Sequence, residues 1–562
     1  MTFPFPFIPA FNSRYSIVNS LRLRASASAK ADRTPGANGN KEKWIVATWV
    51  KQGAITGDRH LWAVDTTNLD YLMFGATTGA QLEVQIGGVT RLRTDSTTGM
   101  QFRDPSAWMQ IVVSYDSANA TASLRLRVFV NGTEITSGFG IDNRAGITSG
   151  QSKMHQTVLH RLGYRPDNTG IYNDHLRADD IFVDGHCINS GDYSITDFGS
   201  TNADGVWVPK AFTQAVGTQG SHLNYADTTS QTTMGYDTSG NANHWTLSWN
   251  PVASGVTYDA FVDTPTNNYC VLSPLIQVGI DNTNFLISGG NNLVVANNSG
   301  YRNVSATFYP EGLKGYFEIK VSGTPNGLVG LMDLTRAQPS NADYTISYGS
   351  QGQVSFELNT GNTKNGASTV TSGYLSAPAD TDVIGCAFDF TGGARNIWWA
   401  KNGIWGTNGG VGNPATGANP ALTISTITTQ GRFWFAINTA GGTQTLGCNF
   451  GQRPFAYTPP SGFKALCTAN LGIAAPTASG TFTGNAAADG PFVWIGGVPS
   501  TLTINGNAVT FGTHADKTAG GFKLRTSSAS YNASGSNTWS ATFASPSTQS
   551  AFAVPQTAQG NP

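Results

Sequence analysis

Paired carboxylates are the first residues to consider as catalysts, because hydrolysis of a glycosidic bond usually needs two of them about 5–9.5 Å apart. The chain has six glutamates, and none lies two to four residues from another acidic residue on an expected strand; they are Glu42, Glu83, Glu134, Glu311, Glu318 and Glu357. Asp179 and Asp180 are neighbours, and adjacent strand residues point to opposite faces. We expect these aspartates in a solvated loop or turn and expect no enzymatic activity. A site assembled from aspartates distant in sequence is the alternative.

Metal ligands are the second kind of chemistry to consider. His155 and His160 are five residues apart, and His175, His186 and Cys187 lie in one short stretch, but none of these spacings is that of a known zinc site. We therefore expect no metal and no cofactor. The alternative is Ca²⁺ held by loop oxygens, with four candidate ligands: Asp58, Asp179, Asp180 and Asp184.

Aromatic side chains give the best indication of binding, because Trp and Tyr are frequent anchors in recognition sites. Trp398 and Trp399 are strand neighbours, so one of them faces away from the other, and Trp405 follows the Asn402-Gly403 turn in a glycine-rich segment. The candidate ligand-binding residues are Trp405, Trp399, Tyr344, Asp343, Tyr348, Tyr172 and Asn173.

Composition indicates a folded protein of several domains. The 562 residues include 39% hydrophobic and only 12% charged residues, with a net charge of -1. Sufficient apolar content for cores excludes disorder throughout, and the absence of a basic excess argues against nucleic acid or an anionic membrane as partner. The five cysteines include no CxxC pair, so we expect buried thiols rather than a disulfide framework.

Strand signals recur along the chain, whereas helical periodicity is nearly absent. Residues 44–50 (WIVATWV) are apolar on both faces, as expected of a strand between two layers. Asn-Gly turns at 131–132, 402–403 and 505–506 follow strand-like runs and favour type I′ hairpins. Many short strands with frequent turns predict an all-β protein of tandem antiparallel β-sandwiches with a small C-terminal β domain.

The first part of the chain resembles laminin-G and concanavalin A-like lectin sandwiches. The resemblance rests on 44–51 (WIVATWVK), 108–116 (WMQIVVSYD), 128–134 (VFVNGTE), 160–165 (HRLGYR) and 176–185 (LRADDIFVDG). Three further blocks resemble a pattern found in bacteriophage structural proteins, namely 205–210 (GVWVPK), 235–245 (GYDTSGNANHW) and 263–270 (DTPTNNYC). The lectin likeness implies carbohydrate binding, against the alternative of a purely architectural role.

The second part resembles a SPRY domain, a β-sandwich that binds partners through loops and is not an enzyme. The blocks that carry this resemblance are 315–320 (GYFEIK), 382–390 (DVIGCAFDF), 397–403 (IWWAKNG), 449–455 (NFGQRPF) and 459–466 (PPSGFKAL). The last part, with 481–494 and 521–525, is similar to a C-terminal β module of phage proteins. The expected divisions are a lead segment 1–14, a first sandwich 15–200, a linker or completion 201–275, a second sandwich 276–470 and a C-terminal domain 471–562.

Together these resemblances imply a virion protein, a tail fibre or spike that binds a bacterial surface glycan or protein. The alternatives are a capsid decoration or head-fibre protein and a polysaccharide depolymerase. By the same analogy we expect a homotrimer on the surface of the phage particle, whose copies raise avidity, with no nucleic acid and no membrane insertion.

The first residues, MTFPFPFIPAF, have no signal-peptide pattern, so we expect release by another route such as lysis. Four of these residues are candidates to dock into other virion proteins: Phe3, Phe5, Phe7 and Phe11. A disordered end is the alternative.

Overall fold

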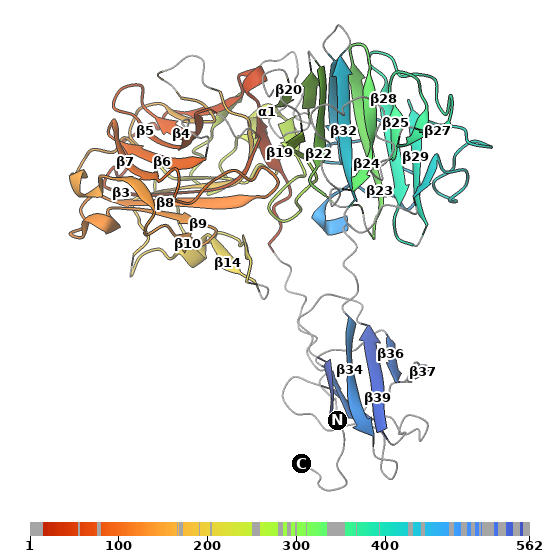
Figure 1. The fold of residues 1–562 in the computed structure, drawn as a ribbon. Helices are drawn as coiled ribbons and strands as arrows, with labels where there is room; N and C mark the ends of the chain where they lie inside the picture. The colour runs from red at the N-terminus through yellow and green to blue at the C-terminus, as the bar shows by residue number, and fades with distance from the viewer. Residues whose placement is uncertain are drawn as a thin grey trace, which may run out of the picture. The chain divides into compact units, whose positions relative to one another are not determined.

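The structure is a computed structural model in which the chain forms two compact units, Met1–Leu471 and Gly472–Pro562 (Figure 1). It describes residues 15–249, 259–278, 285–333, 354–424 and 431–470 and the strands of the second unit between 477 and 554, with short internal gaps. Nearly all regular structure is β, which confirms the predicted all-β class of antiparallel β-sandwiches.

The first sandwich consists of two facing antiparallel sheets. In spatial order, the first sheet contains β10 (Thr133–Glu134), β9 (Leu126–Val130), β8 (Met109–Asp116), β3 (Lys43–Gln52), β13 (His175–Asp184), β1 (Ser20–Leu23) and β18 (Ala260–Phe261), and β16 (Ser221–Leu223) also pairs with β13. The second sheet contains β11 (Phe139–Asp142), β7 (Val89–Thr94), β6 (Gln81–Ile86), β5 (Asp70–Gly75), β4 (Arg59–Val64), β12 (His160–Leu162), β2 (Lys30–Arg33) and β17 (Thr246–Ser248). Residues 201–275 thus supply three edge strands to this sandwich.

The predicted two-faced strand is β3, and it is buried on both sides. Trp44 and Val46 point into the core between the two sheets, where Trp44 stacks on Tyr115 with ring centroids 5.1 Å apart. Ile45 and Ala47 point the other way, into a cluster covered by the segment from 188 to 216. Period-two alternation therefore places apolar residues against two different layers.

The second sandwich has the same plan. In spatial order, the third sheet contains β19 (Leu272–Val278), β22 (Gly300–Ala306), β32 (Gly431–Thr439), β24 (Gly327–Asp333), β25 (Val354–Glu357), β26 (Thr363–Asn365) and β27 (Ser368–Thr371). The fourth sheet contains β20 (Phe285–Ser288), β21 (Val294–Asn297), β33 (Gln444–Asn449), β23 (Lys314–Ser322), β28 (Val383–Asp389), β29 (Arg395–Lys401) and β30 (Ile404–Trp405), and β31 (Leu422–Ile424) pairs with β29.

The second unit has two small antiparallel sheets. One contains β34 (Thr477–Gly484), β39 (Gly535–Thr542), β36 (Thr501–Ile504) and β37 (Asn507–Ala508), and the other contains β38 (Phe522–Arg525), β35 (Phe492–Ile495) and β40 (Ala551–Val554).

A short ribbon in the first unit pairs β14 (Gly199–Thr201) with β15 (Trp207–Pro209). The α-helix described is α1 (Gln231–Met234), and 3-10 turns occur at Ala25–Ala27, Ala122–Leu124, Arg144–Gly146, Ile195–Asp197 and Thr468–Asn470. Within the described ranges, no helix has the length and apolar character needed to span a bilayer.

Two of the predicted Asn-Gly hairpins have the expected backbone. Asn131 and Gly132 have φ of 47° and 76°, and Asn402 and Gly403 have φ of 50° and 80°. Positive φ at both central residues is the signature of a type I′ turn. The turn residues at 505–506 lie outside the described residues, although β36 and β37 on either side of them pair as expected.

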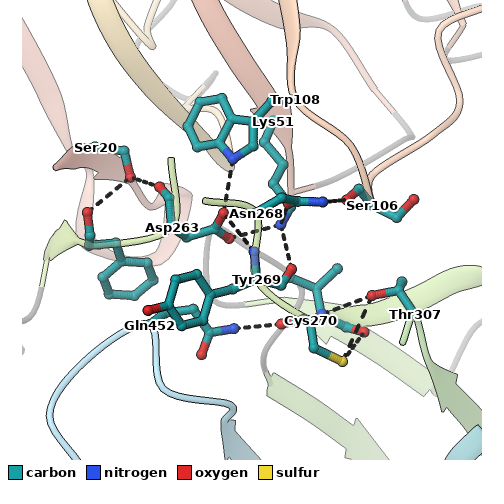
Figure 2. A network of polar contacts seen from close by, with 12 residues as sticks. Ser20, Lys51, Ser106, Trp108, Asp263, Asn268, Tyr269, Cys270, Thr307 and Gln452 are labelled. Atoms are coloured by element: carbon teal, nitrogen blue, oxygen red, sulfur yellow. Dashed lines mark hydrogen bonds and ion pairs between the residues drawn. The ribbon is translucent and has the colours of Figure 1, made fainter. Parts of the chain in front are cut away.

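The two sandwiches of the first unit share a continuous hydrophobic core. Trp49 and Trp108 from the first sandwich belong to the same buried cluster as Phe317 and Phe433 from the second. A polar network crosses this core (Figure 2). In it, Asp263 forms an ion pair with Lys51 and accepts a hydrogen bond from the indole N–H of Trp108. The block DTPTNNYC thus lies at the joint between the sandwiches.

Candidate ligand-binding site

An open polar pocket of about 560 Å³ lies on the first sandwich where β2 pairs with β17. We call it the β2–β17 pocket, and it is lined by Asp32, Arg33, Thr34, Gly36, Leu159, Ala242, Asn243, His244 and Thr246. The lining comes from two strands and from the GYDTSGNANHW block. A pocket of this size with a few convergent polar groups has the usual dimensions of a small-ligand site.

Asp32 presents the one carboxylate among the residues that line the pocket. Its neighbours in the sheet are Thr246 on β17 and Arg161 on β12. Arg161 donates to both carboxylate oxygens, with its Nη2 at 3.0 Å from Oδ2, and the Lys30 ammonium lies 3.4 Å from the same oxygen. These cations hold the carboxylate in one orientation, since a bidentate guanidinium pair fixes its geometry.

The wall formed by 235–245 is built around Asp237. Its carboxylate is buried and accepts backbone N–H bonds from His222, Ser239 and Asn243 at 2.8–2.9 Å. The Asn243 amide nitrogen donates to the carbonyls of Gly220 and Thr218 at 2.7 and 2.9 Å. A loop with its polar groups satisfied in this way is rigid, and it positions the next residue, His244.

His244 is exposed and has an assignable tautomer. The backbone N–H of Asp237 donates to His244 Nδ1 at 3.0 Å, which places the proton of the neutral ring on Nε2. The ring packs on Tyr236, with centroids 4.4 Å apart and planes inclined by 30°. Tyr236 is itself 41% exposed. An N–H donor and an aromatic surface therefore lie together beside the pocket.

The base of the pocket is also fixed. Arg33 is buried and donates to the Gln219 carbonyl oxygen at 2.7 Å and to its side-chain oxygen at 3.2 Å. Burial lowers the pKa of Arg33 to about 10, so the side chain stays cationic at neutral pH. The pocket can accept and donate hydrogen bonds at once, which is what an array of hydroxyl groups requires.

Two predicted site residues of the first sandwich lie near this sheet but not in the pocket. Tyr172 is half-buried, and its ring lies 4.3 Å from that of Tyr164. Asn173 is only 1% exposed, and its amide donates to the His60 carbonyl. The prediction of a ligand contact at Asn173 is corrected here: the residue fastens the end of β13 to β4 and is closed to solvent.

The tryptophans of the second sandwich pack inside it. Trp399 is fully buried and stacks on Phe356 with ring centroids 5.6 Å apart, so its predicted role in ligand binding is also corrected. Trp398, on the opposite face, is covered by the loop whose Ala418 carbonyl accepts its indole N–H at 2.8 Å. Trp405 is half-buried and packs on the cluster that contains Trp398 and Phe463. Covered faces on both sides of β29 explain why neither neighbouring tryptophan is exposed.

The acidic group on β13 is buried, contrary to the expected solvated loop. The pairing of β13 with β3 shifts register between Ala178 and Ile181, and Asp179 has φ of 53°, so both aspartates turn inward. Asp180 receives two bonds from Arg177 at 2.6 and 2.7 Å, and Asp179 lies 2.6 Å from His222 Nε2. A buried bulge, whose carboxylates are paired with Arg177 and hydrogen-bonded to His222, replaces the expected turn.

Two Ca²⁺ or thiol features expected from the sequence have structural roles, namely Asp184 and the cysteines. Asp184 accepts from the backbone N–H groups of Asn40 and Gln219 at 2.6 and 2.9 Å, a structural use of this Ca²⁺ candidate. Among the residues that the structure describes, no three His, Cys, Asp or Glu side chains cluster as metal ligands would. All five cysteines are free and buried, as predicted.

The remaining predicted site residues lie outside the described residues. They are Asp343, Tyr344 and Tyr348 of the second sandwich and Phe3, Phe5, Phe7 and Phe11 of the lead segment. Asp32, Tyr236 and His244 were not among the residues predicted from the sequence. The signal for the last two was present in GYDTSGNANHW, where an aromatic ring and an imidazole flank a turn-forming run of small polar residues.

Comparisons with known proteins find distant similarity to solved structures alone. No protein-family model matches the chain, and no curated protein sequence matches it. Among solved structures, the SPRY domain of human HERC1 is 14% identical, with 32% of this chain and 99% of that chain covered and a TM-score of 0.25. Domains LG4-5 of the mouse laminin alpha1 chain are 12% identical, covering 82% of this chain and 97% of that chain, with a TM-score of 0.23. A SAP-like pentraxin from Limulus polyphemus is 11% identical over 30% of this chain and 77% of its own, with a TM-score of 0.22.

Proposed function

We propose that this protein is a non-catalytic bacteriophage tail fibre or spike adhesin whose first sandwich binds a bacterial surface glycan. The observation that carries the proposal is the β2–β17 pocket, which is lined by Asp32 and His244 and has the exposed Tyr236 ring packed on His244 beside it. The bacterial host and the position on the particle rest on the resemblance of the 205–270 blocks to phage structural proteins.

The chemistry of the pocket suits a sugar. Asp32 accepts hydrogen bonds from hydroxyl groups, and His244 Nε2–H donates to a hydroxyl or ring oxygen. Tyr236 offers an apolar face to the C–H side of a sugar ring while its hydroxyl stays in water. Because the Asp237 loop and Arg161 already fix these groups, binding orders few side chains and costs little conformational entropy.

A binding role fits the carboxylate distribution better than hydrolysis does. The β2–β17 pocket has Asp32 as its one acidic lining residue, held by Arg161 and Lys30. A second cavity, at the joint between the sandwiches, has Glu318 as its one acidic lining residue. Glycoside hydrolysis needs an acid and a base or nucleophile flanking one bond, and neither cavity supplies two carboxylates.

A glycan array of bacterial surface polysaccharides tests the proposal. The full-length chain is expected to bind a subset of glycans, and Tyr236→Ala is expected to weaken binding by about tenfold or more, the factor that corresponds to about 1.4 kcal/mol. Leu124→Ala, which removes another exposed apolar side chain from the same sandwich, is the matched control and keeps full binding. A protein that binds no polysaccharide, or a Tyr236→Ala variant with unchanged binding, contradicts the proposal.

A further inference from the structure

A cavity of about 460 Å³ lies at the joint between the two sandwiches. It shares no lining residue with the β2–β17 pocket. We call it the junction cavity. It is lined by Arg22 of the first sandwich and by Glu318, Lys320, Ser322, Val383, Thr445, Gly447, Asn449, Arg453, Pro454 and Ala456 of the second. Its existence depends on the two sandwiches being held together, which the shared core and the Asp263 network provide.

The floor of the junction cavity is the pair of strands β23 and β33. Their register places Lys320 opposite Gly447 and Ser322 opposite Thr445. Alternate residues of paired strands share a face, so these four positions form a continuous row on the cavity side. Gly447 leaves the middle of the floor without a side chain. The floor therefore presents hydroxyl and ammonium groups around an open centre, which is an arrangement that can bind a polar ligand.

The charged residues that line the cavity are mostly cationic. Lys320 is exposed and forms no ion pair with any residue that the structure describes, while Arg22 and Arg453 bring two further cations. Asp259 is shared between Arg22, at 3.1 Å, and Arg24, at 2.6 Å. Of the charged residues that line the cavity, Arg22, Lys320 and Arg453 are cationic and Glu318 is anionic, and Lys320 is the exposed cation among them.

Glu318 does not oppose an anion as strongly as its charge suggests. Its carboxylate is buried and accepts bonds from the Tyr316 hydroxyl at 3.0 Å and from the backbone N–H groups of Ala456 and Tyr457 at 2.7 and 2.8 Å. These three hydrogen bonds partly neutralise the negative charge of the carboxylate. The side chains left to meet a ligand are the Lys320 ammonium and the hydroxyls of Ser322 and Thr445.

We propose that the junction cavity is a second binding site, for a sugar unit that carries one anionic group, a carboxylate or a phosphate. Lys320 pairs with the anionic group, and Ser322 and Thr445 bind the hydroxyls of the ring. The volume is within the range of small-ligand pockets. Acidic sugars of both kinds occur in charged polysaccharides, so the site adds charge recognition to the hydroxyl recognition proposed for the first sandwich, and it stands independently of that proposal.

Isothermal titration of the full chain with D-glucuronate and with glucose 6-phosphate tests the site, and neutral glucose is the reference. We expect at least one of the two anions to bind about tenfold more tightly than glucose, and the better of them identifies the anionic group. Equal or absent binding of all three overturns the proposal. Because an exposed ion pair is screened by salt, added NaCl is expected to weaken the binding.

Two variants place the binding in the junction cavity. A Cβ on Gly447 would meet its nearest neighbours at 3.8 Å and 3.9 Å, both on Lys320, which is ordinary contact, so Gly447→Val fits the strand and fills the cavity. It is expected to abolish anion binding, and Lys320→Met is expected to reduce it about tenfold. Lys464→Met, which changes an exposed lysine outside the cavity, is the control and keeps full affinity. If Gly447→Val does not fold, Lys320→Met decides, and unchanged affinity in that variant contradicts the site.

Discussion

The ammonium of Lys51 and the carboxylate of Asp263 form an ion pair of 2.8 Å that is almost completely closed to solvent (Figure 2). Lys51 lies on β3 of the first sandwich, and Asp263 begins the segment that leads into the second. The same ammonium also donates to the Asn268 side chain at 2.7 Å and to the Tyr269 carbonyl at 2.8 Å. One cation thus fastens the connecting segment to the central strand of the first sheet.

Removing one partner of this pair is predicted to be costly. Asp263→Asn leaves the Lys51 ammonium buried without its counter-ion, so the free energy of unfolding should fall by about 3–5 kcal/mol. Lys51→Met combined with Asp263→Asn should recover part of that loss, because no uncompensated charge remains. Urea unfolding followed by tryptophan fluorescence measures both.

Asp167→Asn is the matched control for the buried pair. It breaks the Arg165–Asp167 pair, whose side chains are 28% and 24% exposed, and should cost less than about 1 kcal/mol. Equal effects at Asp263 and Asp167 would contradict a special role for the junction pair.

Acid is predicted to destabilise the first sandwich through its buried histidines. Burial lowers the pKa of His60 and His160 to about 3, that of His155 to about 4, and that of His175 well below its ordinary value. The unfolded chain takes up these protons near pH 6.5 and the folded chain does not. Stability is therefore complete above about pH 6.5 and falls as the pH drops toward 3–4, by roughly 2 kcal/mol per histidine at pH 5.

Two carboxyl groups oppose this trend, and burial raises the pKa of one of them, Asp174, above its ordinary value. Burial raises the pKa of Asp70 to about 6, so the folded state binds this proton more readily than the unfolded state and gains stability between about pH 6 and pH 4. The effect of these two aspartates does not cancel that of four histidines. Urea midpoints at pH 7 and pH 5 check the net loss, and His160→Gln should reduce it by one histidine's share. A midpoint that is higher at pH 5 would contradict the account.

The turn at Gly132 is predicted to tolerate no side chain. Its φ is 76°, and a Cβ there would lie 2.4 Å from the indole ring of Trp207. Gly57 has φ of 78° and open space around it. Gly57→Ala should therefore lower the free energy of unfolding by the backbone strain alone, about 1 kcal/mol. Gly132→Ala should lower the free energy of unfolding by more than Gly57→Ala does, because the added methyl group must also displace Trp207. Equal unfolding free energies for the two variants would show that Trp207 moves freely.

Trp405→Ala is predicted to act on stability more than on glycan binding. Trp405 is half-buried against the cluster of Trp398 and Phe463, and its truncation should lower the unfolding free energy by about 1–3 kcal/mol. Binding through the β2–β17 pocket should stay unchanged, since that pocket lies on the other sandwich. Glycan binding lost together with retained stability would return Trp405 to the binding site.

The virion assignment predicts where the protein lies on the particle. Immunogold labelling of intact virions with an antibody against residues 276–470 should place gold at the tail tip or fibres. Gold over the head would instead favour a decoration protein, and a particle without gold would contradict the virion assignment.

The strands and turns could be predicted because their signals are local. Alternation from Trp44 to Val50 and the Asn131-Gly132 pair each determine a conformation through neighbouring residues alone. The site could not be predicted in this way, because Asp32 and His244 are about two hundred residues apart and meet only through the pairing of β2 with β17. Trp399 and Asn173 were misassigned because burial depends on the layer that covers a residue, which the residue type does not reveal.

A crystal structure of the full chain soaked with a polysaccharide fragment that binds in the glycan array tests the β2–β17 pocket as the glycan site. We expect sugar density in the β2–β17 pocket, against the Tyr236 ring and within hydrogen-bonding distance of Asp32 and His244 Nε2. Density for the same fragment at another surface, with the β2–β17 pocket holding only solvent, would contradict this expectation.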